Sequence, residues 1–164
     1  MRKAAIIMGS DTDWSVMKKA AVALKELEVP FEVHVYSAHR TPAEAGAFAE
    51  AARDNGFGVI IAGAGMSAAL AGALASKTTL PVIGVPLDAD LDGMDALLTT
   101  VMMPPGIPVA SVGINGAKNA ALLAAQILAV EDSALAEKLT KQKQDMHDAV
   151  LAKDQRIQEE VNAL

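Results

Sequence analysis

The chain has 164 residues, 52% of them hydrophobic, which suits one globular domain with a substantial core and excludes a disordered chain. Its net charge is −6 and its basic residues are dispersed, so no basic stripe indicates nucleic acid as a partner. The chain has no cysteine, which excludes disulfides, thiolate catalysis and cysteine-ligated metals. No signal peptide and no apolar stretch of membrane-spanning length is recognisable, so we expect a cytoplasmic protein that does not enter a membrane.

Short apolar runs alternate with helical patterns along most of the chain. The predicted strands are 4–8, 31–36, 58–62, 81–85 and 109–112. Five helices are predicted. The first covers 13–29, and the second is opened by Thr41 as N-cap and closed by Asn55-Gly56. The third ends near Lys77, the fourth is a short helix within 88–100, and the fifth covers 118–130. This alternation is typical of βαβ units with a parallel sheet covered on both faces. We therefore predict an α/β fold with three α/β/α layers and a flavodoxin-like, five-stranded parallel sheet.

The C-terminal segment 133–164 has a different pattern. Its apolar residues form one narrow helical seam on an otherwise charged helix: Leu135, Leu139, Met146, Val150, Ile157, Val161 and Leu164. We predict a catalytic domain over 1–132 and a long C-terminal helical arm over 133–164. The arm either packs on its own domain or, as the narrow seam favours, lies on a neighbouring subunit.

Ligands of open parallel sheets bind at the carboxyl ends of the strands. That rule selects residues 9–14, 37–42, 63–72 and 86–95. In the first segment Gly9 permits a tight turn before a helix N-terminus that suits an anion. Asp13 there either caps the helix or accepts hydrogen bonds from sugar hydroxyls.

The second segment contains the residues best suited to acid–base chemistry. His39 is the one histidine at a predicted strand end, whereas His34 lies within a strand and His147 lies on the charged tail helix. An imidazole there can act as general acid or base near neutral pH. The neighbouring Arg40 suits a phosphate or a carboxylate.

The third segment is rich in glycine and alanine. Gly63, Gly65 and Ala68 satisfy a G-x-G-x-x-A pattern, with Asp88 twenty residues further on, so one hypothesis is a dinucleotide site. The other is a dry pocket, lined by backbone, for a small neutral molecule. A receiver domain would need an aspartate after the third strand, where this chain has Ala62-Gly63. No metal-ligand cluster, Walker A motif or G-x-S-x-G motif is present.

Read together, these segments resemble a known family. The matching pieces are Met8-Gly9-Ser10 with Asp13-Trp14, Ser37-Ala38-His39-Arg40-Thr41-Pro42, 59–65, 80–86, Met103-Pro104 with 106–109, and 119–128. They occur in the family's order and cover residues 4 to about 130. The chain resembles the class I form of 5-(carboxyamino)imidazole ribonucleotide mutase, from de novo purine biosynthesis.

The resemblance implies a homo-octamer with sites at subunit junctions, and neither a metal nor an organic cofactor. The substrate it implies is an aminoimidazole ribonucleotide whose exocyclic amine carries a carboxyl group, which the reaction moves to ring carbon 4. By analogy Ser10 and Arg40 hold the phosphate, Asp13 binds the ribose, and His39 carries the proton. Carbon dioxide would wait in the loop 63–72. The substrate-binding set implied in this way is Ser10, Asp13, Ser37, Arg40, Gly63, Ala64, Gly65, Ser67 and Leu70.

One departure from the family pattern lies in the loop 65–72. The usual Gly-Gly-Ala-Ala-His-Leu-Pro-Gly is here Gly-Met-Ser-Ala-Ala-Leu-Ala-Gly, so Ala69 replaces a histidine and Ala71 a proline. Ser67 and Leu70 make this stretch more similar to class II enzymes, carboxy-lyases that carboxylate aminoimidazole ribonucleotide directly with carbon dioxide. Direct carboxylation is therefore one alternative function, and a non-catalytic nucleotide-binding homologue is another.

Overall fold

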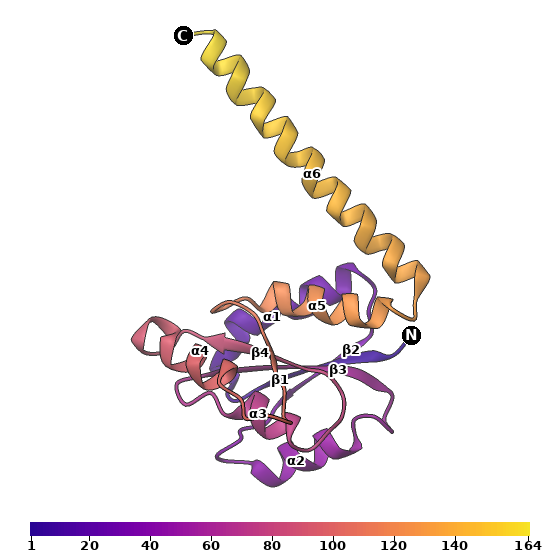
Figure 1. Ribbon diagram of the computed structural model, residues 1–164, viewed down its shortest axis with the longest axis vertical. Coiled ribbons are helices and arrows are strands. Elements are labelled where there is room, and N and C mark those ends of the chain that lie inside the picture. The colour runs from indigo at the N-terminus through magenta and orange to yellow at the C-terminus, as the bar shows by residue number, and fades with distance from the viewer.

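A computed structural model describes the whole chain, Met1–Leu164, and its centre is one parallel sheet (Figure 1). The strand order is β2-β1-β3-β4-β5, which is the flavodoxin-like order, and every neighbouring pair is parallel. The strands are β1 Lys3–Met8, β2 Phe31–Val35, β3 Phe57–Gly65, β4 Val82–Leu87 and β5 Ala110–Ser111. The predicted fold class is confirmed.

Helices cover both faces of the sheet, as Figure 1 shows. They are α1 Trp14–Glu26, α2 Pro42–Ala51, α3 Leu70–Ala75, α4 Met94–Val101, α5 Ala117–Ala129 and α6 Ser133–Asn162, with 3₁₀ turns at Asp11–Asp13 and Leu91–Gly93. Helices α1 and α5 share a core with one face of the sheet, and α2 and α3 share a core with the other. Three layers result, and the site lies at their carboxyl-terminal edge.

Alternate residues of the central strands enter opposite cores. Ile6 and Ile61 face α1 and α5, while Ile7 and Ile60 face α2 and α3, and all four are fully buried. A strand buried on both faces needs apolar residues at every position, which explains why these segments do not alternate in the sequence. Helix α5 meets α1 through small side chains, all fully buried: Ala117, Ala120, Ala121, Ala124 and Ala125.

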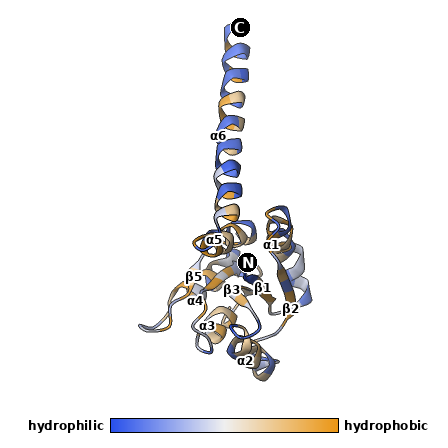
Figure 2. Ribbon diagram, turned by 90° about the vertical axis from the view of Figure 1, so that its right-hand side faces the viewer, coloured by the Kyte–Doolittle hydropathy of each residue, from blue (hydrophilic) through white to orange (hydrophobic).

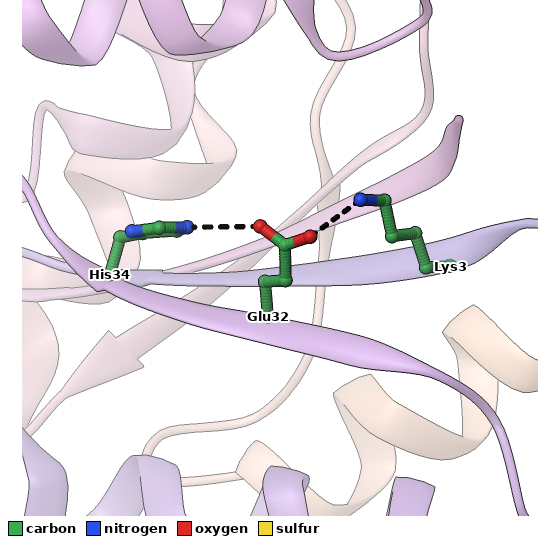
Figure 3. A network of polar contacts seen from close by, with 3 residues as sticks. All are labelled: Lys3, Glu32 and His34. Atoms are coloured by element: carbon green, nitrogen blue, oxygen red, sulfur yellow. Dashed lines mark hydrogen bonds and ion pairs between the residues drawn. The ribbon is translucent and has the colours of Figure 1, made fainter. Parts of the chain in front are cut away.

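The edge strand β2 is less buried than the central strands. Phe31, Val33 and Val35 share one of its faces, and Val35, at the carboxyl end of this edge strand, is 51% exposed. On the other face Glu32 accepts from Lys3 Nζ (2.5 Å) and contacts His34 Nε2 (3.4 Å), as Figure 3 shows. The hydrogen bond from Lys3 is the main reason that the pKa of Glu32 is lowered. His34 also stacks on Tyr36.

Helix α6 is anchored only at its first turns. Leu135 is fully buried and Leu139 nearly so, in the core that contains α1 and α5, and Lys138 forms an ion pair with Glu28. The Asp132 side chain caps the helix by accepting from the Leu135 N–H at 3.0 Å. Beyond these turns the helix projects away from the domain (Figures 1 and 2). None of the helices combines the length and the apolar character that crossing a membrane requires.

Candidate functional site

A cavity of about 620 Å³ opens where β1, β2 and β3 end. Nine of the ten predicted site residues line it: Ser10, Asp13, Ser37, His39, Arg40, Ala64, Gly65, Ser67 and Leu70. The three loops meet because parallel neighbours end at the same edge of the sheet. Met8 is paired with both Val35 and Gly63, so the segments that follow these residues start side by side.

A larger hollow of about 930 Å³ lies near the amino end of β4, at Pro81 and Val82. Three of its four charged side chains are already engaged within the chain: Lys77 pairs with Glu50 at 3.1 Å, and Arg53 donates to the Thr79 hydroxyl at 2.9 Å. We therefore place the candidate site in the cavity at the carboxyl-terminal edge of the sheet, where the side chains of Asp13, His39 and Arg40 converge.

The loop after β1 is closed by a capping box. The Ser10 hydroxyl accepts from the Thr12 N–H (3.4 Å), and Asp13 Oδ2 accepts from the Ser10 N–H (3.0 Å). Burial raises the pKa of Asp13, although the N–H groups of Ser10 and Gly9 and the charge of Arg40 act in the opposite direction. One carboxylate oxygen of Asp13 thus holds the loop after β1 in place, and the other oxygen makes no hydrogen bond within the chain.

The loop after β2 is held by two hydroxyl groups. Ser37 Oγ accepts from the N–H groups of His39 (3.3 Å) and Arg40 (3.1 Å). Thr41 Oγ1 accepts from the Ser37 N–H (2.8 Å) and donates to the Ser37 carbonyl (3.2 Å). Thr41 stands at the predicted N-cap position of α2, but its side chain caps nothing there, because both of its bonds go back to Ser37. We call residues 37–41 the histidine turn.

The histidine turn presents its two charged or titratable side chains to the cavity. The His39 ring is exposed and makes no hydrogen bond to the rest of the chain. Arg40 Nη2 donates to the Gly9 carbonyl at 3.1 Å, which ties the turn to the loop after β1 and leaves the other guanidinium donors free. The remaining histidines are engaged elsewhere, His34 with Glu32 and His147 with Asp148.

The third wall of the cavity is mostly small and apolar, and Ser67 contributes its one hydroxyl group. Ala64, Gly65, Ala69 and Leu70 contribute to it from the end of β3 and the start of α3. Gly63 was predicted to belong to the site but is absent from the lining, because its Cα faces α1. A Cβ at this position would lie 2.4 Å from Met17 Sδ.

The structure also adds lining residues that were not among the ten predicted site residues. Ala89 lines the cavity from the loop after β4, next to Gly65, whose Cβ would lie 3.1 Å from that of Ala89. Of the whole segment 86–95, only Ala89 reaches the cavity. The sequence feature that could have identified Ala89 as a lining residue is its position two residues after the end of the strand β4. The other additions are Gly9, Thr12, Ala38, Met66 and Ala69, all beside predicted residues.

The dinucleotide hypothesis does not suit this geometry. Gly63 and Gly65 lie within β3, not in a turn that opens a helix, and Asp88 is not part of the cavity lining. No group of three or more histidine, aspartate or glutamate side chains in the chain is arranged to hold a metal ion.

Comparisons with known proteins agree with one another. The family model of AIR carboxylase matches residues 3–149. The N5-carboxyaminoimidazole ribonucleotide mutase of Pyrococcus abyssi is 55% identical over 147 residues, covering 89% of this chain and 84% of that protein. The Bacillus subtilis protein of the same name is 55% identical, covering 89% and 92%. The crystal structure of Treponema denticola PurE has a TM-score of 0.86 at 27% identity, covering 93% and 96% of the two chains.

Proposed function

This chain belongs to the AIR carboxylase family, and we propose that it is an N5-carboxyaminoimidazole ribonucleotide mutase of purine biosynthesis. Several relatives with that name share about half of its residues over most of its length. The reaction transfers the carboxyl group from the exocyclic amine of the substrate to carbon 4 of its imidazole ring. The resulting 4-carboxy-5-aminoimidazole ribonucleotide keeps its phosphate and ribose unchanged.

The observation that supports this proposal is the convergence of three functional groups on one cavity. Arg40 offers free guanidinium donors for a phosphate, and Ser10 stands beside it on the neighbouring loop. Asp13 keeps one carboxylate oxygen for the ribose hydroxyls. His39 has a ring with no other partner and is the one histidine of the cavity. We assign these residues the substrate-binding and proton-transfer roles.

His39 can carry one proton out and back in a single turnover. It protonates the exocyclic nitrogen as the carbamate C–N bond breaks and carbon dioxide departs. Carbon 4 then attacks carbon dioxide, and the new C–C bond leaves that carbon with both a proton and a carboxylate. His39, now neutral, removes the proton, and the ring regains its aromaticity. The proton balance closes without any other acid or base.

The apolar wall made by Ala64, Gly65, Ala69 and Leu70 provides the place for carbon dioxide. It offers no hydrogen-bonding side chain that would hold water beside the reacting carbon. We further propose, on the family resemblance, that the chain works as a cytoplasmic homo-octamer whose sites lie at subunit junctions.

The decisive experiment compares two carboxyl sources with the purified protein. One assay supplies the carbamate substrate while carbon dioxide is scavenged, and the other supplies aminoimidazole ribonucleotide with bicarbonate. Rapid turnover of the carbamate, insensitive to scavenging, is the expected result. Turnover only with free carbon dioxide would replace the mutase by a direct carboxylase. If neither assay shows turnover, the proposed enzyme would be replaced by a non-catalytic protein that binds a nucleotide.

His39→Asn tests the proton carrier within the same assay. We expect turnover to fall by at least about a thousandfold, because general acid–base catalysis typically contributes 10²–10⁴-fold and this proton is transferred twice. The matched control is His147→Asn on α6, far from the cavity, which keeps full turnover. Normal turnover by His39→Asn would contradict the assignment.

A further inference from the structure

The start of the loop after β4 is held by a single distant residue, Asn115. Strand β5 ends at Ser111, and the turn that follows brings Asn115 beside the end of β4. Asn115 Oδ1 accepts from the Asp88 N–H at 3.0 Å, and the Asn115 N–H donates to the Pro86 carbonyl at 2.9 Å. One residue thus uses both its side chain and its backbone to fix the point where β4 leaves the sheet.

Asn115 takes the place of a longer β5. In a parallel sheet, every second residue of a strand directs its peptide groups toward the same neighbouring strand. Gly84, Pro86 and Asp88 therefore all face the β5 side. The Val112 N–H donates to the Gly84 carbonyl at 3.2 Å, and Asn115 supplies the next two hydrogen bonds along this edge. The pairing of β4 is in this way continued after β5 has ended.

The backbone of Asn115 restricts which residues can do this. Its φ is 58°, in the left-handed region, which asparagine adopts more readily than most other residues. Glycine also adopts this conformation without strain, but it has no side chain to accept from Asp88. A glycine at this position therefore removes the side-chain hydrogen bond and leaves the backbone as it is.

The loop that Asn115 holds has few other attachments. Between the end of β4 and the 3₁₀ turn at Leu91–Gly93, the Asp88 N–H is the one backbone group bonded to a distant part of the chain. Leu91, Asp92 and Gly93 have successive φ values of 48°, 54° and 77°. Such a run of left-handed residues persists only where its surroundings fix it. The hydrogen bond to Asn115 is therefore the main restraint on the path of this loop.

Ala89 is what the loop contributes to the site. It is the one residue of the segment 86–95 in the cavity lining, and a Cβ on Gly65 would lie 3.1 Å from the Ala89 Cβ. Ala89 thus closes the apolar wall at Gly65, one residue beyond the N–H that Asn115 holds. Asn115 itself does not line the cavity, so any effect on the reaction passes through Ala89.

We propose that Asn115 is a positioning residue, which keeps Ala89 against Gly65 and so keeps carbon dioxide inside the cavity during the carboxyl transfer. The inference rests on the proposed function, because a wall of this kind matters where a free intermediate must not escape. Without the hydrogen bond to Asp88 the loop moves away from β3. Water then enters beside the reacting carbon, and carbon dioxide exchanges with the solvent.

Isotope retention in the full-length protein tests this proposal. The protein receives the carbamate substrate with a labelled carboxyl group in unlabelled bicarbonate buffer, and mass spectrometry measures the label in the product. The parent protein should return labelled product. For Asn115→Gly, the unlabelled fraction of the product should rise at least about tenfold over the parent in the same buffer. Ala89→Gly keeps both hydrogen bonds of Asn115 but shortens the wall, so it should lose label as well.

The matched control is Asn55→Gly, in the exposed turn before β3, which should retain label as the parent does. Circular dichroism verifies that every variant is folded. Full label retention by either Asn115→Gly or Ala89→Gly would overturn the inference, even if turnover is slower, because a merely structural role lowers activity without releasing carbon dioxide. The parent protein tests the proposed function separately. If it forms no product from the carbamate, the proposed function and this inference both fail, whereas full retention by a variant of an active parent overturns only the inference.

Discussion

The chemistry of the site depends on how a few hydroxyl groups are used. Ser37 was predicted to bind substrate, but its oxygen already accepts two backbone N–H groups, so only its O–H proton remains available to a ligand. Thr41 holds Ser37 in turn through its N–H and its carbonyl. The partly buried hydroxyl groups of Ser37 and Thr41 therefore position the exposed ring of His39 and the guanidinium group of Arg40.

Thr41→Val removes that hydroxyl without changing the shape of the side chain. We expect kcat to fall at least about tenfold, because the histidine turn loses two bonds, and stability to fall by about 1–3 kcal/mol. Thr41→Ser should restore both bonds and most of the activity. Steady-state kinetics and thermal melting measure the two effects, and an unchanged kcat for Thr41→Val would show that the turn is rigid without Thr41.

Asp13 makes stability depend on pH in a definite direction. Burial raises its pKa above the ordinary 3.8, so the folded state holds this proton more tightly than the unfolded state does. Stability due to this group therefore falls as pH rises from the unfolded pKa through the raised folded pKa.

Asp13→Asn removes this dependence and keeps an oxygen to accept from Ser10. We expect the variant to gain stability relative to the parent as pH rises, with the gain complete above the raised pKa, and to bind substrate more weakly. Denaturant unfolding between about pH 4 and pH 7 measures the difference. A difference that shrinks as pH rises would contradict this reading.

At the scale of elements, close approach between helices and sheet depends on small residues in the strands. Gly84 in β4 lies directly under α4, where an added Cβ would meet Thr100 Cγ2 at 2.3 Å and Val109 Cγ1 at 3.2 Å. Thr100 cannot easily turn away, because it is buried and donates to the Ala96 carbonyl at 2.7 Å. The helix thus packs on backbone at this point.

Gly84→Ala should therefore destabilise the domain by about 1–3 kcal/mol, the usual cost of overpacking. Gly113→Ala is the matched control, because a Cβ there meets nothing within 4 Å. Chemical denaturation compares the two variants. Equal stabilities would show that α4 moves aside at no cost.

At the scale of the whole molecule, the domain and the projecting arm depend on different parts of α6. Leu135 and Leu139 complete the core, whereas every residue after Gln142 is exposed. A stop codon after Thr140 should therefore leave the domain folded while lowering the mass of the assembly in light scattering. Deletion from Ser133 should in addition lower the melting temperature, because it exposes the core. An unchanged mass after the first truncation would show that the arm has no part in assembly.

Much of this molecule was predictable because the relevant signals are local in the chain. Buried parallel strands need runs of apolar residues, and helices need an apolar stripe, so the order of elements and the three layers follow from patterns of a few residues. The carboxyl-end rule then selected all four segments that contribute to the cavity, and the Ser-Ala-His-Arg-Thr-Pro string identified the family to which the comparisons also lead.

What only the tertiary structure decided concerns contacts between residues far apart in the chain. Gly63 turned out to face Met17, Ala89 joined the cavity across two strands, and Thr41 bonded back to Ser37 instead of capping α2. Local patterns state which residues are small, polar or apolar, but not which neighbour each one meets. The amino-acid sequence thus determined the helices and strands and the chemical groups of the site. The packing of helices on the sheet decided which residues face the cavity, the core or the solvent.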